Sequence, residues 1–249
     1  MTSASEKICR ILSCLSDRRI CKLTDIARFT GLDISSVLRI LKDLEKLDFV
    51  EREPQTKEYT LGREIYAMHH AMVARQDIRA LARPALVRMA RKYGDSLILS
   101  IPSNWESVCV DTCLGDYPIR ANYLEIGSRR PLGVGAGSLM LLAALSDTQQ
   151  QMYLPCIHEQ IDKRYPMFNQ SMLKTQIALC RQQQYAVLCD VVVNQMGGIG
   201  VAIRAPDGMP IAALSLAALS ERILSRQNGI AADLMEEARL IEKTHFPAR

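Results

Sequence analysis

The chain has 249 residues, of which 48% are hydrophobic and 23% are charged, and its formal net charge is +4. This globular composition has room for one large domain or two smaller ones, and no apolar run reaches the roughly 20 residues that a membrane-spanning helix needs. Charged side chains among the first twenty positions exclude a secretory signal, so we expect a cytoplasmic protein with no membrane partner.

Two helices are predicted at the start of the chain. Apolar residues at helical spacing predict the first over residues 6–15. Thr24 is expected to cap a short second helix over residues 25–29, because its hydroxyl can accept a hydrogen bond from a backbone N–H of the next turn. Gly31 is expected to end this helix, since glycine adopts the left-handed conformation without a steric penalty.

A third helix is predicted after Asp33, and a hairpin follows it. The hairpin consists of two extended stretches, residues 49–52 and 58–61, on either side of a turn-forming segment. The helix carries hydroxyl and basic side chains opposite an apolar face. The members of that apolar face are Ile34, Val37, Leu38, Leu41 and Leu44.

This order of elements predicts a winged helix-turn-helix over residues 1–62. The third helix suits the major groove of double-stranded DNA, where Arg39 can donate two hydrogen bonds to guanine. Net charge gives little support for DNA binding, because residues 1–62 hold eleven Lys and Arg against ten Asp and Glu. A winged helix used only for protein contacts is the alternative. The candidate DNA-binding residues are Thr24, Ser35, Ser36, Arg39, Lys42, Thr56 and Lys57.

Helical periodicity continues over residues 63–92, where Pro84 is placed to start or kink a second segment. Residues 63–78 are expected to form a linker helix that packs either on another subunit or on its own domain. The remainder, residues 79–249, alternates short strands with helices and predicts an α+β domain with a mostly antiparallel sheet. The strands are expected at 97–101, 107–111, 118–123, 186–189, 200–204 and 211–216, and the helices at 137–145, 148–156, 169–184 and 225–244.

A glycine-rich segment, residues 132–138, leads into one of these helices. Its glycines allow a ligand to approach the backbone closely, and unpaired N–H groups at a helix start attract a carboxylate. Ser138 can cap this helix or donate to the same ligand. The alternative is that the glycines serve only the packing of helix on sheet. Arg129 and Arg130 are also within reach of an anionic ligand, but structural or inter-subunit ion pairs are the favoured expectation, which leaves both outside the site.

Across nearly its whole length the sequence resembles the IclR family of bacterial transcriptional regulators. The order and spacing of several short motifs carry the resemblance, since no one motif is decisive. In the first domain they lie at residues 23–27, 30–32, 38–44, 50–52 and 59–62, and in the second at 127–132, 135–137, 185–187, 198–200, 206–208 and 212–215.

The resemblance implies a winged helix that binds an operator as part of a dimer, joined to a GAF-like effector-binding domain. It implies dimers or dimers of dimers, an organic, sugar or aromatic acid as effector, and control of an operon that degrades this compound. With Ser138 added from the argument above, the implied effector-binding residues are Gly135, Ala136, Gly137, Ser138, Asp190, Ile199, Ser215 and Ala217. Among them, Asp190 and Ser215 would orient ligand hydroxyls, while Ile199 and Ala217 would line the wall.

The sequence departs from the family pattern at three places. Ile34 stands where a lysine often precedes the recognition-helix serines, and Gly133 stands where many members have a histidine. The acidic stretch after the 185–187 strand is reduced to Asp190, followed by residues 191–193, which are all valine. These changes predict a ligand different from those of the better-known members.

An enzyme with an accessory DNA-binding domain is a less favoured alternative. Eight cysteines are scattered without a Cys-x-x-Cys pair, and the four histidines lie at no metal-ligand spacing, so we expect neither a metal nor a cofactor. No nucleophile–base pair or Gly-x-Ser-x-Gly elbow is present, so no catalytic residue is predicted. A docking protein without a ligand is a third reading, against which the glycine-rich helix start counts.

Overall fold

The computed structural model describes residues 3–16, 21–73, 77–120, 124–165, 168 and 170–246. Contacts divide the chain into two compact units, Met1–Asp77 and Ile78–Arg249. The predicted boundaries of the linker, residues 63 and 78, stay predictions, and its residues 74–76 lie outside the described residues.

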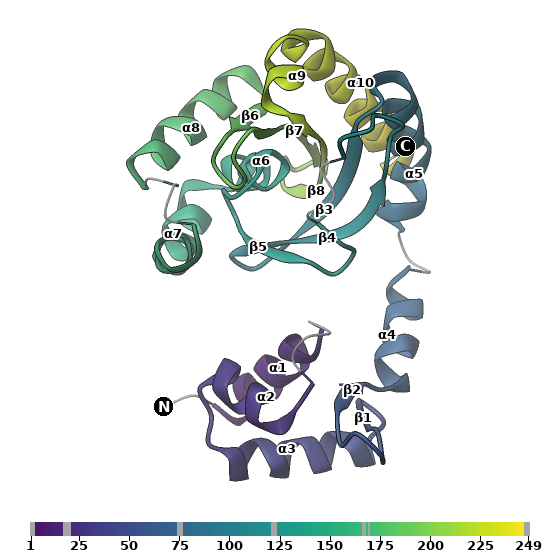
Figure 1. The fold of residues 1–249 in the computed structure, drawn as a ribbon, viewed down its shortest axis with the longest axis vertical. Coiled ribbons are helices and arrows are strands. Elements are labelled where there is room, and N and C mark those ends of the chain that lie inside the picture. Colours follow the sequence, from purple (N-terminus) through teal and green to yellow (C-terminus); the bar gives the residue numbers. More distant parts are fainter. Residues whose placement is uncertain are drawn as a thin grey trace. The chain divides into compact units, whose positions relative to one another are not determined.

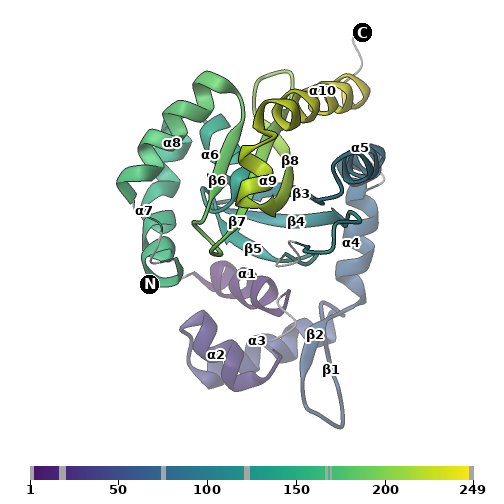
Figure 2. The ribbon, with the colours of Figure 1, turned by 45° about the horizontal axis from the view of Figure 1, so that its top comes forward.

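The first unit is built from helices around one apolar core, with a hairpin beside them (Figure 1). Its elements are α1 (Ala4–Leu15), α2 (Leu23–Thr30), α3 (Ile34–Lys46), β1 (Val50–Arg52), β2 (Tyr59–Leu61) and α4 (Arg63–Val73). Each of the first three helices turns an apolar face inward, and Ile11, Ile26 and Leu41 meet there fully buried. β1 and β2 pair antiparallel and project as a wing, which Figure 2 shows extending from the helices.

Local capping rules explain where α2 and α3 end and begin. Gly31 ends α2 in the left-handed conformation with φ +69°, as predicted. The side chain of Asp33 accepts a hydrogen bond from the backbone N–H of Ser36, 2.8 Å away, and so caps the start of α3.

Two expectations for this unit are wrong. Thr24 does not cap α2, because the helix begins at Leu23, two residues before the predicted start. Lys22 occupies the capping position and forms no side-chain cap. Ile34 is not part of the core; it is 52% exposed because α3 begins at this residue, beyond the contact with α1 and α2. The rest of the predicted apolar face is buried or half-buried.

The second unit is organised around a curved antiparallel sheet, shown behind and around α6 in Figure 1. Every pairing among its strands is antiparallel, and their order within the described residues is β5-β4-β3-β8-β7-β6. The strands are β3 (Ser96–Ser103), β4 (Glu106–Cys113), β5 (Arg129–Pro131), β6 (Ala186–Cys189), β7 (Met196–Arg204) and β8 (Pro210–Leu219). The predicted fold class is confirmed.

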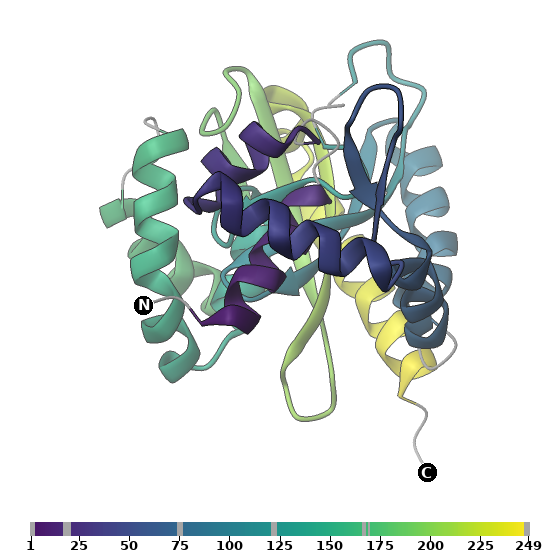
Figure 3. The same ribbon diagram turned by 90° about the horizontal axis from the view of Figure 1, so that it is seen from below.

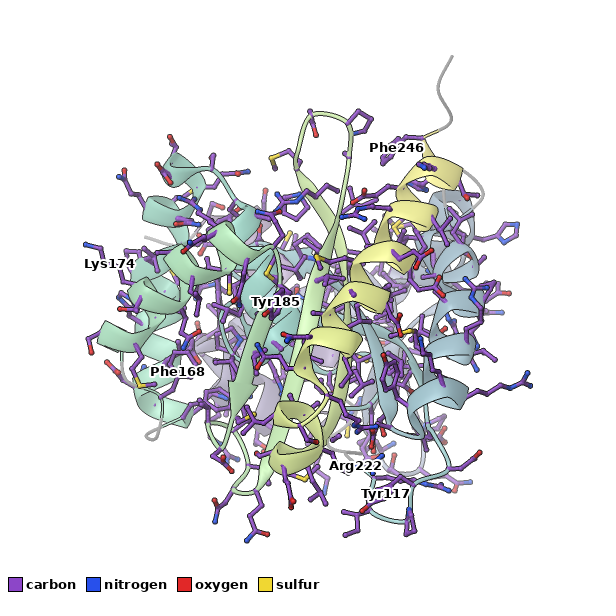
Figure 4. The ribbon with its side chains drawn as sticks, turned by 90° about the horizontal axis from the view of Figure 1, so that it is seen from above. Tyr117, Phe168, Lys174, Tyr185, Arg222 and Phe246 are labelled. Carbon is purple, nitrogen blue, oxygen red and sulfur yellow. The ribbon has the colours of Figure 1, made fainter. Side chains whose placement is uncertain are left out.

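Helices cover both faces of this sheet and create two cores. The helices are α5 (Ile78–Tyr93), α6 (Ala136–Ala144), α7 (Asp147–Arg164), α8 (Gln170–Gln183), α9 (Ser220–Leu224) and α10 (Gln227–His245). α5 and α10 lie side by side on one face, as Figures 1 and 4 show, and α6 lies on the other with α8 against it. Because side chains alternate along a strand, β7 sends Ile199 and Val201 to the first core and Ala202 to the second.

A β-bulge in β4 changes which face of the sheet its side chains point to. Ser100 of β3 pairs with Cys109, whereas the preceding Leu99 pairs with Asp111, so Val110 is the extra residue. Cys109 and Asp111 therefore face opposite sides of the sheet despite their even spacing. Asp111 lies on the α5 side, where Arg83 pairs with it at 3.0 Å.

Several predicted bounds differ from the structure. The periodicity over residues 63–92 belongs to two helices, and Pro84 lies inside α5 and does not start it. Residues 118–120 form no strand, and 121–123 lie outside the described residues. The strand next to β4 is β5, which sequence reasoning missed because three residues carry no readable alternation.

Candidate functional site

The first candidate site is the open face of α3, which Figure 3 shows running across the first unit. Ser35, Arg39 and Lys42 follow one another at helical spacing and are exposed. The Ser35 hydroxyl donates to the Asp33 carboxylate at 2.6 Å, so this serine also belongs to the cap. Neither Arg39 nor Lys42 forms an ion pair with any described residue, which leaves two cationic groups facing solvent.

The wing and the start of α2 carry the other predicted DNA-binding residues. Thr56 and Lys57 lie exposed at the tip of the hairpin, and Thr56 Oγ1 accepts from the backbone N–H of Glu58 at 3.3 Å. Lys57 has φ +63°, a left-handed conformation that turns the chain back toward β2. Thr24 is exposed in the first turn of α2. Their contacts with DNA stay predictions.

The second candidate site is a pocket in the second unit between the start of α6 and the sheet. Its volume is about 40 Å³, enough for a few water molecules. β3, β4, β5, β7 and β8 all contribute lining residues. These are Ile98, Ser100, Ser107, Cys109, Leu124, Ser128, Arg130, Val134, Gly135, Ala136, Gly137, Ser138, Gly198, Ser215, Leu216 and Ala217.

The start of α6 supplies this pocket with unpaired hydrogen-bond donors. Gly135 precedes the helix with φ +96° and provides no side-chain cap. The N–H of Leu139 donates to the carbonyl of Gly135 at 2.8 Å. Among the described residues no acceptor pairs with the N–H groups of Ala136, Gly137 and Ser138, and the helix dipole makes this end positive.

Small residues let α6 approach the sheet closely. A Cβ on Gly200 would lie 2.6 Å from the backbone N of Gly137, and a Cβ on Gly137 would lie 3.0 Å from Ser215 Oγ. The packing explanation for the glycines therefore holds at these positions. It is compatible with a ligand role, because the same approach brings the helix start against the pocket.

Serine hydroxyls form the polar wall. The Ser107 hydroxyl donates to Ser138 Oγ at 3.0 Å, and the Ser138 hydroxyl donates to the carbonyl of Pro131 at 3.1 Å. Ser138 is thus engaged inside α6 and is not its cap. Ser100 and Ser215 are 8% and 9% exposed, and within the described residues neither hydroxyl has a hydrogen-bond partner.

The two neighbouring arginines of β5 face opposite sides of the sheet. Arg129 pairs with Glu106 at 3.0 Å and donates to Ser103 Oγ at 3.1 Å, as expected of a structural ion pair. Arg130 lines the pocket. Sequence reasoning left Arg130 outside the site because it treated the two arginines alike, although strand alternation is the signal that separates them.

Two predicted pocket residues lie elsewhere. Ile199 is fully buried in the α5 and α10 core, because it alternates with the glycines of β7 that face α6. Asp190 is exposed, and its carboxylate accepts from the hydroxyl of Ser220 at 3.1 Å and the N–H of Gln195 at 2.7 Å. Asp190 has a left-handed backbone conformation, with φ +61°, and these hydrogen bonds stabilise the turn between β6 and β7. The other six predicted residues line the pocket.

An apolar hollow adjoins the pocket and shares Gly135, Ala136 and Gly198 with it. Its remaining wall comes from the end of β6 and the turn after it. These residues are Leu188, Val191, Val192, Val193, Met196 and Gly197.

The described part of the chain contains no group of His, Cys, Asp and Glu side chains arranged to hold a metal ion, and none of its helices is long and apolar enough to cross a membrane. The cysteines of this part form no disulfide. Burial raises the pKa of the Cys109 thiol to about 11 and that of Cys180 to about 12, so both stay protonated at neutral pH.

A winged helix with an exposed basic recognition helix, joined to a domain with a small polar pocket, defines a ligand-responsive DNA-binding protein. Residues 70–243 match the family model of the bacterial transcriptional regulator IclR C-terminal domain, and residues 6–58 match that of the MarR family. The chain belongs to the IclR family. It is a DNA-binding transcriptional regulator with an effector-binding C-terminal domain, and not an enzyme.

Curated relatives agree with this assignment. The HTH-type transcriptional regulator XynR of Escherichia coli K12 is 28% identical over 204 residues, covering 81% of this chain and 80% of the relative. The HTH-type transcriptional repressor AllR of the same strain is 24% identical over 202 residues, covering 81% and 74%.

Solved structures share the fold. A putative IclR regulator from Silicibacter sp. TM1040 has a TM-score of 0.87 at 18% identity and covers 99% of this chain and 97% of its own. An IclR homologue from Microbacterium hydrocarbonoxydans, complexed with 4-hydroxybenzoate, has a TM-score of 0.72 at 21% identity, covering 97% and 98%.

Proposed function

We propose that this regulator binds its operator as a homodimer through paired α3 helices, and that a small carboxylic acid in the second unit sets its affinity for DNA. The genes it controls degrade this acid. A two-fold symmetric dimer matches a pseudo-palindromic operator, with one half-site for each α3.

The observation that carries the effector assignment is the convergence of unpaired donors in one pocket. The N–H groups at the start of α6 suit an anion. The hydroxyls of Ser100 and Ser215 line this pocket and have no hydrogen-bond partner among the described residues, so a ligand in the pocket can satisfy them. The homologue that binds 4-hydroxybenzoate takes a carboxylic acid, which supports the same class here.

Coupling between the two units requires that the acid bind one arrangement of the dimer better than another. The α4 helix joins the DNA-binding elements to the pocket unit along the chain, and it is the element through which we expect a change in the dimer to reach α3.

The test is a fluorescence anisotropy titration of the full chain on the DNA upstream of its own gene. The expected result is saturable binding that outlasts competitor DNA and weakens with salt. Aliphatic, aromatic, hydroxy and dicarboxylic acids are then added one at a time, and one class should change the operator affinity. Equal binding to any DNA would overturn the operator assignment, and indifference to every acid would overturn the effector assignment.

A further inference from the structure

Arg130 borders the start of α6, and it is not among the predicted effector-binding residues. In the β4–β5 pairing it lies directly opposite Ser107, and opposed residues of an antiparallel pair point to the same face. Ser107 lines the pocket, and so does Arg130. A Cβ on Gly135 would lie 3.6 Å from Arg130 Nη1, so the guanidinium and the helix start border the same space.

The charge around this space is simple. Arg130 is the only formally charged side chain among the described residues that line the pocket or the hollow. It adds one positive charge to the positive end of α6. A guanidinium beside backbone N–H groups provides parallel donors for the two oxygens of a carboxylate.

The space beyond this cationic end has the opposite character. The adjoining hollow is walled by Leu188, the valines of residues 191–193 and Met196. It offers no charged or hydroxyl side chain, so a second carboxylate or a polyhydroxylated chain placed there would lose its hydration without a partner. An alkyl or aryl group placed there would instead be removed from water favourably.

We propose that Arg130 is the specificity-determining residue of the pocket, and that the effector is a monocarboxylic acid with an apolar body that extends toward residues 191–193. Arg130 and the start of α6 hold the carboxylate, Ser100 and Ser215 contact polar atoms next to it, and the valines contact the body. This inference rests on the proposed acid-binding function and narrows it to one chemical class.

Isothermal titration of the full chain with matched acid and amide pairs tests the role of the charge. The probes are benzoate against benzamide and hexanoate against hexanamide. The wild type should bind each acid at least tenfold more tightly than its amide, because hydrogen bonds between charged groups are the stronger kind. In Arg130→Gln this preference should fall to about threefold or less, with amide affinity unchanged.

Two variants serve as controls. Arg129→Gln removes the arginine next to it in β5, which faces away from the pocket, and should keep the full preference for the acid. Arg130→Lys keeps the charge without the planar fork and should bind acids several-fold more weakly than the wild type. It also decides the question if thermal melting shows that Arg130→Gln does not fold.

A chain-length series tests the apolar body. From acetate through butanoate to hexanoate, wild-type affinity should rise by about fourfold per added methylene. Val192→Ser should flatten this slope without changing the preference for acid over amide. Succinate and gluconate should bind more weakly than hexanoate.

The possible results distinguish failure of the Arg130 assignment from failure of the proposed acid-binding function. If no carboxylate of any kind binds, the proposed effector class fails. If acids bind and Arg130→Gln keeps the full preference over amides, Arg130 is not the selecting residue while the acid effector stands. If succinate or gluconate binds more tightly than hexanoate, the apolar body is refuted.

Discussion

The guanidinium of Arg222 lies over the ring of Tyr117, with 3.6 Å between the guanidinium carbon and the ring centroid, and Figure 4 shows the two side chains together. The same guanidinium makes two 3.0 Å hydrogen bonds to the carboxylate of Asp95. Arg226 adds a third at 2.6 Å. Tyr117 follows β4, and its backbone N–H donates to the carbonyl of Gly94 at 2.8 Å, so this cluster ties residues after β4 to the junction of α5 and β3.

Asp95→Asn should destabilise the second unit by about 3 kcal/mol. Asp95 is 3% exposed, and removing its charge leaves two partly buried arginines without their partner. Urea unfolding followed by circular dichroism measures the loss. Asp43→Asn, which breaks an exposed pair with Lys46 on α3, should change stability by less than about 0.5 kcal/mol. Equal effects of the two variants would contradict the structural role of the cluster.

Arg39→Ala should weaken specific operator binding by about 1–3 kcal/mol, because one guanidinium contact with a base edge is lost. Anisotropy titrations at several salt concentrations measure both affinity and its salt dependence. Lys163→Ala on α7, which removes an exposed cation paired with Glu159 in the other unit, is the control and should leave binding unchanged. Unchanged operator affinity in Arg39→Ala would remove α3 from the recognition role.

Asp33→Ala should lower the thermal unfolding midpoint of the first unit, since the cap of α3 is lost. Hydrogen bonds from Ser35, which has the larger effect, and from Ser36 hold the pKa of Asp33 well below its ordinary value of 3.8. A carboxylate with a depressed pKa stabilises the fold above its ordinary value, and this contribution is lost as pH falls through the folded-state pKa. The variant should therefore differ from the wild type at pH 7 and converge with it only below about pH 3.8. Asp33→Asn keeps a capping oxygen and should lose less.

Gly200→Ala should cost about 1–3 kcal/mol and impair effector binding, because its methyl group would push the start of α6 off the sheet. Gly229→Ala is the matched control within α10, where a Cβ meets only Tyr93 Oη at 3.7 Å. That change should be neutral or stabilising by up to about 1 kcal/mol, since alanine favours a helix. Chemical denaturation of both variants decides the comparison. Equal stability would mean that α6 tolerates displacement.

Cys109 should react slowly with iodoacetamide at pH 8, and its rate should rise about tenfold per pH unit up to about pH 11. Burial, and then the charge of Asp111, raises its pKa from about 9 to about 11, so the reactive thiolate is scarce below that value. The protonated thiol stabilises the fold below about pH 9, and this contribution is lost as pH rises through 11. Mass spectrometry of labelled peptides measures the rate, with exposed Cys156 as the fast reference. Rapid labelling of Cys109 at pH 8 would show that its pocket is open to solvent.

The sequence predicts the first unit well because its signals are local. Gly31 and Asp33 act on the residues directly beside them, and the apolar spacing of α3 points inward in any winged helix. Thr24 fails because α2 begins two residues before the predicted start, which turns the predicted cap into a helical residue. Ile34 fails although the start of α3 was predicted correctly, because this first helical residue lies outside the contact that buries the rest of the apolar face.

Sequence alone also located the glycine-rich start of α6, since unpaired donors follow from any helix that begins without a cap. Which strand residues face those donors was decided only by the tertiary structure. Ile199 and Gly198 are adjacent in the chain and lie on opposite faces, as do Arg129 and Arg130. The alternation of side chains along a strand predicts that adjacent residues point to opposite faces of the sheet. The face that α6 covers, and the bulge at Val110 that reverses the pattern in β4, depend on contacts between residues far apart in the chain.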